Sequence, residues 1–346
     1  MMKKYDKRIM IFLGLIGLFF ITMAFSLSFG QIHISPLSVV NIVANQLHLP
    51  ALSSVVPTEE EIAVVWHIRL PRTLVGVLVG AALAVAGAVM QGVFGNPLAD
   101  PGIIGVSSGA ALGAVLAISM GLTSIGIFYM PFFAFLGAIL TVALTVFLSM
   151  RHGKIPVMIL LLAGVAVSIF LGAVTSGILT FMNEYKLREF LFWTVGGLDY
   201  RRWEHVYLAV GPIVIGIIIL CLLARHLNIL VLGEEEARSV GVSVIKLRMF
   251  LLFIASLTTA TAVCVSGSIG FVGLVVPHIM RILLGTEHRT LLPACALAGG
   301  IFLLGCDTVG RLVIPPSEIR VGVMTALMGA PYFLFLLRRA QRKGQL

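Results

Sequence analysis

Residues 68–109 decide the fold, and they read IRLPRTLVGVLVGAALAVAGAVMQGVFGNPLADPGIIGVSSG. No charged residue interrupts the run between Arg72 and Phe94, and small residues recur along it. A continuous apolar run of about 20 residues is long enough to cross the hydrocarbon core of a bilayer as a helix. The run ends at Gly95-Asn96-Pro97, where Pro cannot continue a helix and Gly allows a tight turn. The stretch therefore predicts a membrane span, a turn and the start of the next span.

The rest of the 346-residue chain repeats this pattern. Apolar residues make up 59% of the chain and charged residues 11%, and the mean hydropathy is +1.07. So few charges cannot cover this much apolar surface in water, so lipid must cover it. We expect an all-α membrane protein with about ten transmembrane helices, formed from ten apolar runs near 9–30, 68–94, 102–121, 128–149, 156–182, 204–224, 247–267, 269–284, 290–312 and 317–337.

Charge distribution predicts the orientation of the chain. With a cytoplasmic N-terminus, sixteen of the 24 Lys and Arg residues fall in inner segments, including Lys3 and Arg342. Cytoplasmic segments carry the excess of Lys and Arg in membrane proteins. Both termini are therefore predicted to be cytoplasmic. The basic start and first apolar run resemble a signal peptide, but a run of this length is more typical of a retained first span.

The predicted spans contain almost no groups that could couple transport to an ion gradient. Proton or sodium coupling usually requires titratable or coordinating side chains near the middle of the membrane. Asp307 has Arg311 one helical turn later, so an ordinary ion pair explains it, and all eight histidines lie at span edges or outside. The chain also has no G-x-x-x-x-G-K-[ST] phosphate loop. Transport must draw energy from a partner or be passive.

The largest inner segment, 225–246, offers a contact for such a partner. Residues 230–241 read LVLGEEEARSVG, which predicts a short helix with a glutamate-rich first turn and a Gly stop. Taken alone, the pattern is equally typical of a solvated loop helix whose glutamates complement the helix dipole. No soluble domain interrupts the chain, so we expect a single transmembrane permease domain over 1–346, in which 225–246 is the candidate coupling segment.

The second to fifth and seventh to tenth helices show a weak internal parallel. Each set opens with a small-residue helix that runs into a Gly/Pro-rich turn, at 95–109 in one set and 267–277 in the other. The two turns are five spans apart, so they enter the membrane from opposite sides. This arrangement is typical of an inverted repeat around a central pathway.

Six ordered motifs give the chain a resemblance over nearly its whole length. They are IRLPR at 68–72, GAVMQ at 87–91, NPLADP at 96–101 with Gly105 to Gly109, LG at 232–233 through Gly241, GFVGL at 270–274 with Pro277, His278 and Arg281, and PPSEI at 315–319 through GAP at 329–331. With these, the sequence resembles the FecCD-type permeases of ABC importers for ferric siderophores, haem and vitamin B12.

The resemblance implies a vitamin B12 permease-like fold and a set of partners. These are a second copy of the chain, two ATP-binding subunits and a periplasmic or lipid-anchored solute-binding protein. ATP and magnesium would act in the partner ATPase, and the chain itself would hold no cofactor or metal. Asn96 and Leu98 match the cytoplasmic gate region of the family. ATPase coupling is assigned by the same match to Leu232, Gly233, Glu234, Glu235, Ala237, Arg238 and Gly241.

Arg69, Arg72 and Arg311 match positions at which the family presents arginines to glutamates of the binding protein. A guanidinium suits this role because its planar fork can grip a carboxylate with two hydrogen bonds. The alternative is anchoring to lipid headgroups, which fits Arg201 and Arg202 better. Arg320 departs from the family, which commonly has Pro there.

The sequence thus predicts a transport subunit, without enzymatic activity of its own, in the cytoplasmic membrane of a bacterium or archaeon. Membrane lipids are expected contacts, and nucleic acid is not. Ferric siderophore is the first expectation for the solute, by its commonness in the family, while haem, cobalamin and small metal oxyanions stay open. An ion-coupled secondary transporter or a passive channel is the alternative class.

Overall fold

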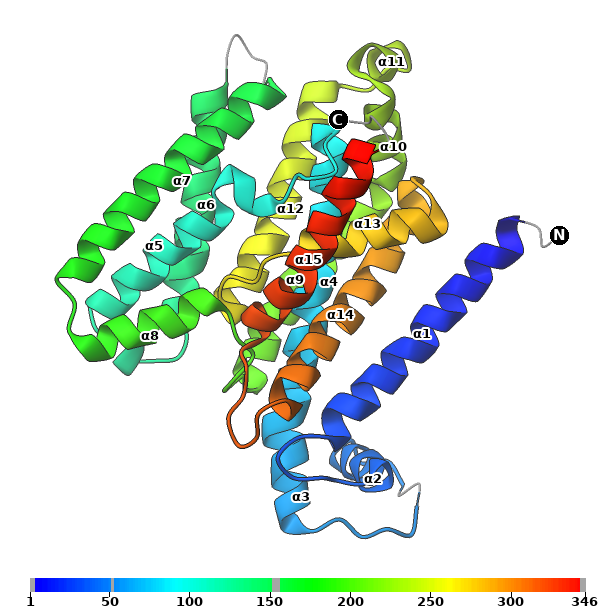
Figure 1. Ribbon diagram of the computed structural model, residues 1–346, viewed down its shortest axis with the longest axis vertical. Coiled ribbons are helices and arrows are strands. Elements are labelled where there is room, and N and C mark those ends of the chain that lie inside the picture. The colour runs from blue at the N-terminus through cyan, green and yellow to red at the C-terminus, as the bar shows by residue number, and fades with distance from the viewer. Residues whose placement is uncertain (1–3, 51–52, 151–155, 343–346) are drawn as a thin grey trace.

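A computed structural model describes residues 4–50, 53–150 and 156–342, and every regular element in these ranges is helical. The predicted cytoplasmic termini, including Lys3, lie partly outside these ranges. Figure 1 shows a bundle of long helices with short helices at both ends. We call the end that carries α11 (Glu234–Ser239) the α11 end, and the opposite end, which carries α3 (Glu59–Ala63), the α3 end.

Ten apolar helices within the described residues confirm the predicted spans. Seven are long and apolar enough to cross a membrane, and three are shorter apolar helices. Their bounds are α1 Lys4–Ser28, α4 Leu70–Phe94, α5 Val106–Ser119, α6 Tyr129–Ser149, α7 Val157–Thr180, α9 Trp203–Leu222, α12 Val244–Ser266, α13 Val272–Leu284, α14 His288–Leu312 and α15 Val321–Arg342.

Three of the connecting segments contain short α-helices, and one of these helices lengthens a span. At the α3 end lie α2 (Pro36–Gln46), α3 and α8 (Glu184–Val195), while α10 (Ala224–Leu232) precedes α11. A capping box starts α3, because the Thr58 hydroxyl accepts from the Glu61 amide and the Glu61 carboxylate accepts from the Thr58 amide. A π-helical turn, Val64–Arg69, joins α3 to α4. The second span is therefore continuous from Glu59, nine residues earlier than the expected start at 68.

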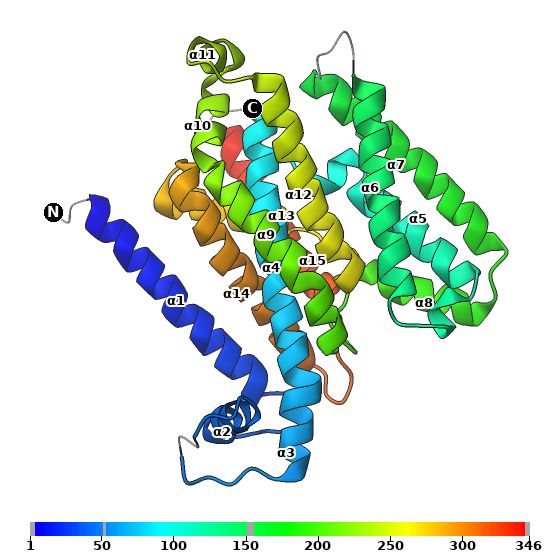
Figure 2. The ribbon, with the colours of Figure 1, turned by 180° about the vertical axis from the view of Figure 1, so that it is seen from behind.

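The core of the bundle forms around α4, which packs against α14, α12, α13 and α9. Figure 2 shows these helices around α4 from behind. Many residues of α4 are Gly or Ala, so neighbouring backbones approach closely, as is common where helices pack within membranes. A Cβ atom added at Gly87 would lie 2.1 Å from the Gly273 carbonyl oxygen, and one at Gly80 would lie 2.2 Å from the Gly299 carbonyl oxygen. Both contacts require glycine, and they fix α4 against α13 and α14.

The predicted parallel between the two halves has a counterpart in the structure. α4 runs toward the α11 end and α12 runs away from it, and each is followed by an irregular segment and a short apolar helix, α5 or α13 (Figure 1). The start of α1 and the end of α15 both point toward the α11 end. This places the two ends of the chain on one side, as an even number of spans requires.

Candidate transport pathway and its two ends

The first irregular segment begins where α4 ends. Gly95 closes the helix with a left-handed backbone (φ 59°), and the Asn96 side-chain oxygen accepts a hydrogen bond from the Leu98 amide at 2.9 Å. Asn96 thus satisfies a loose backbone donor in a turn, as Asn commonly does. Both residues are exposed at the α11 end. Their role in a gate is not tested by this geometry and stays a prediction.

The second irregular segment, 267–271, lies against the first half of the chain. Gln91 of α4 donates to the Gly273 carbonyl at 3.0 Å, next to the Gly87 contact described above. The Asp100 carboxylate caps a 3-10 turn, Pro101–Ile104, by accepting from the Gly102 amide at 2.8 Å. The two breaks lie close together, because a Cβ atom added at Gly273, next to the second break, would lie 2.9 Å from an Asp100 carboxylate oxygen in the first.

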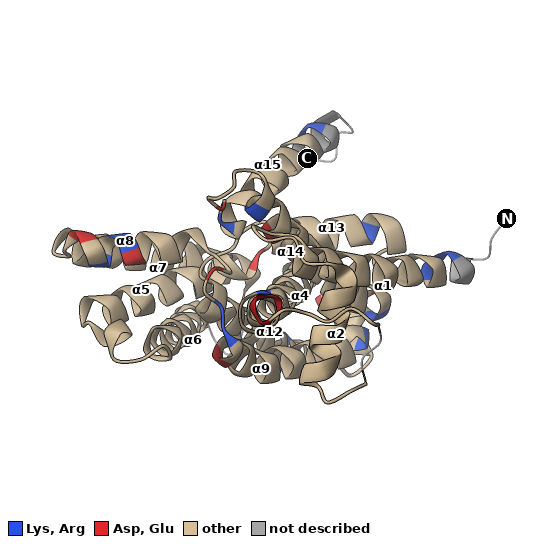
Figure 3. Cartoon of the chain, turned by 90° about the horizontal axis from the view of Figure 1, so that it is seen from below, with Lys and Arg blue, Asp and Glu red and all other residues tan. Residues whose placement is uncertain are grey.

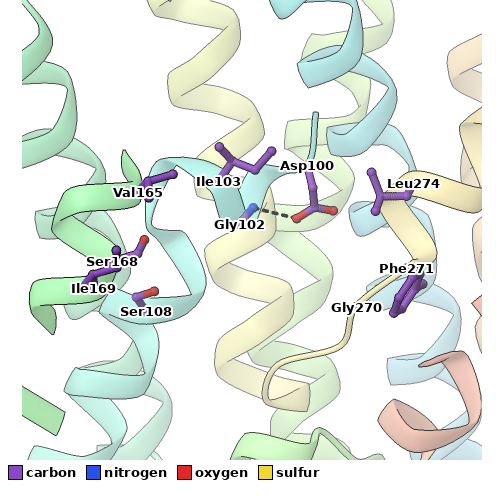
Figure 4. A pocket seen from close by; sticks show the side chains of 10 residues that line it. All are labelled: Asp100, Gly102, Ile103, Ser108, Val165, Ser168, Ile169, Gly270, Phe271 and Leu274. Carbon is purple, nitrogen blue, oxygen red and sulfur yellow. Dashed lines mark hydrogen bonds between the residues drawn. The ribbon is translucent and has the colours of Figure 1, made fainter. Parts of the chain in front are cut away.

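A pocket of about 510 Å³ lies where the two breaks meet (Figure 4). Segments from both halves of the chain form it: the 3-10 turn, α5 and α7 supply one wall, and the 270–274 segment supplies the other. Its lining consists of Asp100, Gly102, Ile103, Ser108, Val165, Ser168, Ile169, Gly270, Phe271 and Leu274. Among the described residues, the lining is mostly apolar and includes no cationic side chain.

The α3 end contains a group of paired charges, which we call the charge cluster: Arg72, Asp199, Asp307, Arg311, Glu318 and Arg320. Arg72 lies at its centre, with Asp307 at 2.7 Å, Glu318 at 2.8 Å and Asp199 at 3.5 Å. Arg311 pairs with Asp307 at 3.2 Å, which confirms the ion pair expected from the sequence spacing. Arg320 pairs with Asp199 at 3.2 Å. Three arginines thus balance three carboxylates and tie α4 to α14 and to the segments before α9 and α15.

Arg69 and Arg311 also hold the end of α1. Arg69 donates to the carbonyls of Leu27, at 2.7 Å, and of Ser28 and Ile32, while Arg311 donates to Ser26 and Phe29 carbonyls at 3.2 Å. The last carbonyls of a helix have no partner within it, so cationic donors there stabilise the helix end. The same contacts attach α1 to α4 and α14.

All three arginines with a predicted docking role are therefore buried and already paired. Arg69, Arg72 and Arg311 are 5%, 9% and 5% exposed. The internal partners of Arg69 and Arg72 could not be foreseen, because they come from distant parts of the chain. Docking itself is not tested by this geometry and stays a prediction. Asp199 and Glu318 were not predicted as site residues, because their partner Arg72 also lies in a distant part of the chain.

The predicted coupling segment projects at the α11 end as two short helices instead of one (Figure 1). Gly233, with φ 138°, ends α10, and α11 starts at Glu234. Leu232 is 72% exposed, whereas Ala237 is buried and anchors α11. Gly241 (φ 81°) closes the turn after α11, where the Val242 amide bonds to the Ala237 carbonyl at 3.0 Å. The predicted Gly stop is thus present.

Glu234 attaches this segment to the bundle. Its carboxylate pairs with Arg238 one turn later at 3.1 Å and with Arg248 of α12 at 2.8 Å. Glu235 is exposed on α11. The segment therefore presents an apolar residue and glutamates outward while α12 holds its base.

Figure 3 shows further Lys, Arg, Asp and Glu residues on α8. Ten apolar helices, two helix breaks that meet at a pocket, and a projecting helical segment at one end together define a multi-pass membrane transport protein. Two breaks of this kind are typical of transporters, because irregular backbone inside a membrane is tolerated where it lines a cavity.

Comparison with known proteins identifies the family. The model of the FecCD transport family matches residues 18–339, so the chain belongs to this family of ABC transporter permeases. The cobalamin import system permease BtuC of Halobacterium salinarum is 47% identical over 275 residues, which cover 80% of this chain and 73% of the relative. The hemin transport permease HmuU of Yersinia pestis is 44% identical over 289 residues, covering 81% and 86%.

A solved structure supports the fold. A metal-chelate type ABC transporter in an inward-facing conformation superimposes with a TM-score of 0.82 at 34% identity, covering 95% of this chain and 99% of that one. The vitamin B12 permease-like fold expected from the sequence is confirmed. The chain is a transport subunit and not an enzyme, since its relatives are permeases and ATP hydrolysis in such transporters belongs to separate subunits.

Proposed function

We propose that two copies of this chain form the membrane channel of an importer that carries a metal chelate inward. Two ATPase subunits bind at the α11 end, and a periplasmic or lipid-anchored binding protein delivers the solute at the α3 end. ATP and magnesium act in the ATPase. The α11 end then faces the cytoplasm of a bacterium or archaeon, with both ends of the chain on that side, in line with the positive-inside distribution of Lys and Arg.

The observation that carries this proposal is the α10–α11 segment. It projects from the bundle with Leu232 exposed, yet its base is fixed by the buried Ala237 and by the pair between Glu234 and Arg248. A segment that is rigid at its base and exposed at its tip can transmit force from a partner to α12. Solvated loops without a partner do not need such an anchor.

The second copy of the chain is expected to cover part of the apolar surface of α7 and α15. Both helices expose large side chains, including Leu162 and Ile169 of α7 and Leu327 of α15. The pocket opens toward α7, since Val165 and Ile169 line it. A dimer that brings two such faces together would enclose a pathway between the subunits.

The solute is proposed from the relatives and the family. The relatives named above carry cobalamin and hemin, and ferric siderophores are the commonest cargo of this family. All three are bulky metal chelates. We therefore propose import of a chelated metal, with cobalamin, haem and ferric siderophore as the compounds to test.

Docking of the binding protein by Arg69, Arg72 and Arg311 is also part of the proposal, and its test must account for their burial. Replacing Arg72 by Glu would place a carboxylate beside Asp307 and Glu318 and disturb the fold. Docking must therefore be measured together with the unfolding temperature. A loss of affinity for the binding protein at unchanged unfolding temperature would support docking, and a loss of both would assign the arginines to the fold.

Reconstitution tests the proposal as a whole. The chain, co-expressed with an ATPase subunit encoded beside it, is placed in liposomes with its binding protein, and uptake of cyanocobalamin, hemin and ferrichrome is measured. Uptake that needs ATP and survives collapse of ion gradients supports the proposal. Uptake that follows the proton or sodium gradient would identify a secondary transporter, and uptake without any energy source would identify a passive channel.

A further inference from the structure

Phe271 has an unusual backbone conformation at the pocket. Three described non-glycine residues have positive φ, and of these only Phe271 (φ 68°) belongs to the segment between two membrane helices of the core. A left-handed backbone costs a non-glycine residue about 1–3 kcal/mol, so it persists only where the surroundings enforce it. The Phe271 carbonyl accepts from the Leu274 and Val275 amides at 3.1 and 2.8 Å, which fixes the start of α13.

The Phe271 side chain packs directly against Gly329 of α15. A Cβ atom added at Gly329 would lie 2.5 Å from the Phe271 Cβ and 2.7 Å from its Cγ. Only glycine lets the aromatic side chain lie this close to the helix. The left-handed backbone of Phe271 and the contact with Gly329 together place the aromatic side chain between the pocket and α15 (Figure 4).

Two serine hydroxyls on the opposite wall have no partner within the described part of the chain. Ser108 of α5 and Ser168 of α7 both line the pocket, and neither hydroxyl forms a hydrogen bond to a described group. Serines and threonines of α12 behave differently, because Ser256 and Thr259 donate to carbonyls one turn earlier at 2.6 and 2.8 Å. The pocket hydroxyls are thus available to a ligand.

The chemistry of the lining indicates the kind of ligand. Apolar side chains form most of the surface, two hydroxyls offer neutral hydrogen bonds, and no cation is present to receive a carboxylate. Asp100 also lines the pocket, and its carboxyl group can hydrogen-bond a neutral polar group but offers no positive charge to a carboxylate. A chelate with an apolar face and neutral amide or hydroxyl groups fits this lining better than a chelate with free carboxylates.

From these observations we propose that the pocket is a contact site for the carried chelate, in which Phe271 forms a fixed apolar wall and Ser108 and Ser168 provide hydrogen bonds. The ligand class is an uncharged chelate with amide or hydroxyl groups. This inference rests on the proposed transport function, and it adds a residue set and a preference among the three compounds.

Filling the pocket provides the first test. In reconstituted transporter, Ser168→Leu is expected to lower the uptake of cyanocobalamin or ferrichrome at least tenfold while ATP hydrolysis and assembly are kept. Ser168→Ala should stay within threefold of the unchanged chain. The control is Ala143→Leu, which introduces a leucine at an exposed position of α6, outside the pocket and away from the proposed contact with the second copy, and should leave uptake unchanged.

Thiol protection provides a second test that does not depend on a bulky replacement. Ser168→Cys and Ala143→Cys are labelled with a membrane-permeant maleimide in a chain whose four native cysteines are replaced by alanine. Excess carried chelate during turnover should slow labelling of the Ser168→Cys variant at least threefold and leave labelling of the Ala143→Cys variant unaffected.

The outcomes separate the two proposals. If the unchanged chain carries none of the three chelates, the proposed function and the pocket assignment both fail. If it carries one, but Ser168→Leu transports normally and the Ser168→Cys variant is not protected, the pocket assignment alone is wrong. Preferential uptake of hemin, which bears two carboxylates, would overturn the ligand class.

Discussion

The two ends of the bundle use the same residue types in opposite ways. At the α3 end, Arg72 and Asp307 are buried and joined at 2.7 Å, and the charge cluster connects four parts of the chain. At the α11 end, Glu234 pairs with Arg238 at 3.1 Å, where both side chains are about half exposed. Charges of the cluster at the α3 end join parts of the fold, whereas the pair at the α11 end lies on an exposed segment, where we propose that the ATPase binds.

This difference predicts how mutations at the two ends divide between stability and assembly. Removing one partner of a buried ion pair leaves a charge without solvation, which costs about 3–5 kcal/mol. An exposed pair contributes roughly 0.2–1 kcal/mol. Substitutions at the α3 end should therefore lower the unfolding temperature, and substitutions at the α11 end should alter ATPase binding with little effect on unfolding.

Asp307→Asn is expected to have the largest effect. Arg72 and Arg311 both rely on this carboxylate, which is 1% exposed. We expect a loss of about 3–5 kcal/mol in stability, measured as a large fall in the thermal unfolding midpoint in detergent. Glu318→Gln, at a more exposed position of the cluster, is the control and should cost less. An unchanged midpoint in Asp307→Asn would mean that the cluster does not support the fold.

Arg320→Ala, at the position where the family commonly has Pro, should have an intermediate effect on stability. The Arg320 guanidinium pairs with Asp199 at 3.2 Å, donates to the Phe192 carbonyl at 2.9 Å and lies 4.4 Å from the Phe192 ring centre. Hydrogen bonds to charged groups contribute about 1.5–3 kcal/mol, so a loss in the lower part of this range is expected for a partly exposed site.

Arg320→Lys separates charge from shape at the same position. A lysine keeps the charge beside Asp199 but has no planar group to stack on Phe192. Its unfolding midpoint should lie between those of Arg320→Ala and the unchanged chain. If both replacements unfold at the original temperature, the contacts of Arg320 are incidental to stability.

Gly241→Ala tests the turn that ends α11. The left-handed backbone at Gly241 (φ 81°) penalises a residue with a Cβ by about 1–2 kcal/mol. Gly241→Asn should be milder, because Asn tolerates this conformation better than Ala. The measurement is ATPase binding to the purified chain together with its unfolding midpoint. Equal binding by the two variants and the unchanged chain would show that the turn does not shape the contact.

Glu234→Gln should change stability least. Its exposed pair with Arg238 is worth less than about 1 kcal/mol, although the contact with Arg248 adds to the attachment of α11. We expect an unfolding midpoint within about two degrees of the unchanged chain and at least a threefold loss in ATPase affinity. The matched control is Glu184→Gln on α8, at the α3 end. This variant removes a similar exposed pair, between Glu184 and Arg188.

The sequence predicted the spans well because each one depends on local composition. All ten apolar runs became helices, since runs of this length have few other ways to satisfy backbone polar groups in lipid. The short helices α2 and α8 were missed, because a brief amphipathic helix in a connecting segment has no comparable signal. The earlier start of the second span was missed as well, although Thr58 and Glu61 show the spacing of a capping box.

Contacts between site residues were predictable only where the partners lie close together in the sequence. The pair between Asp307 and Arg311 followed from a spacing of four residues, and the turn at Asn96 followed from its side chain. Arg72 and Asp307 are 235 residues apart, so only the packing of α4 on α14 reveals their contact. Within 230–241, the glutamates and the Gly stop were predicted, but the break at Gly233 was not, because glycine inside a short helical pattern can also be tolerated.

Photo-crosslinking from the two ends tests the central claim most directly. p-Benzoylphenylalanine is placed at Glu235 of α11 or at Tyr185 of α8, which are both exposed, in the transporter assembled with its ATPase and binding protein. Crosslinks to the ATPase from position 235, and none to it from position 185, are the predicted result. Crosslinks to the ATPase from position 185 but not from 235 would contradict the account, because the α3 end would then face the energy source.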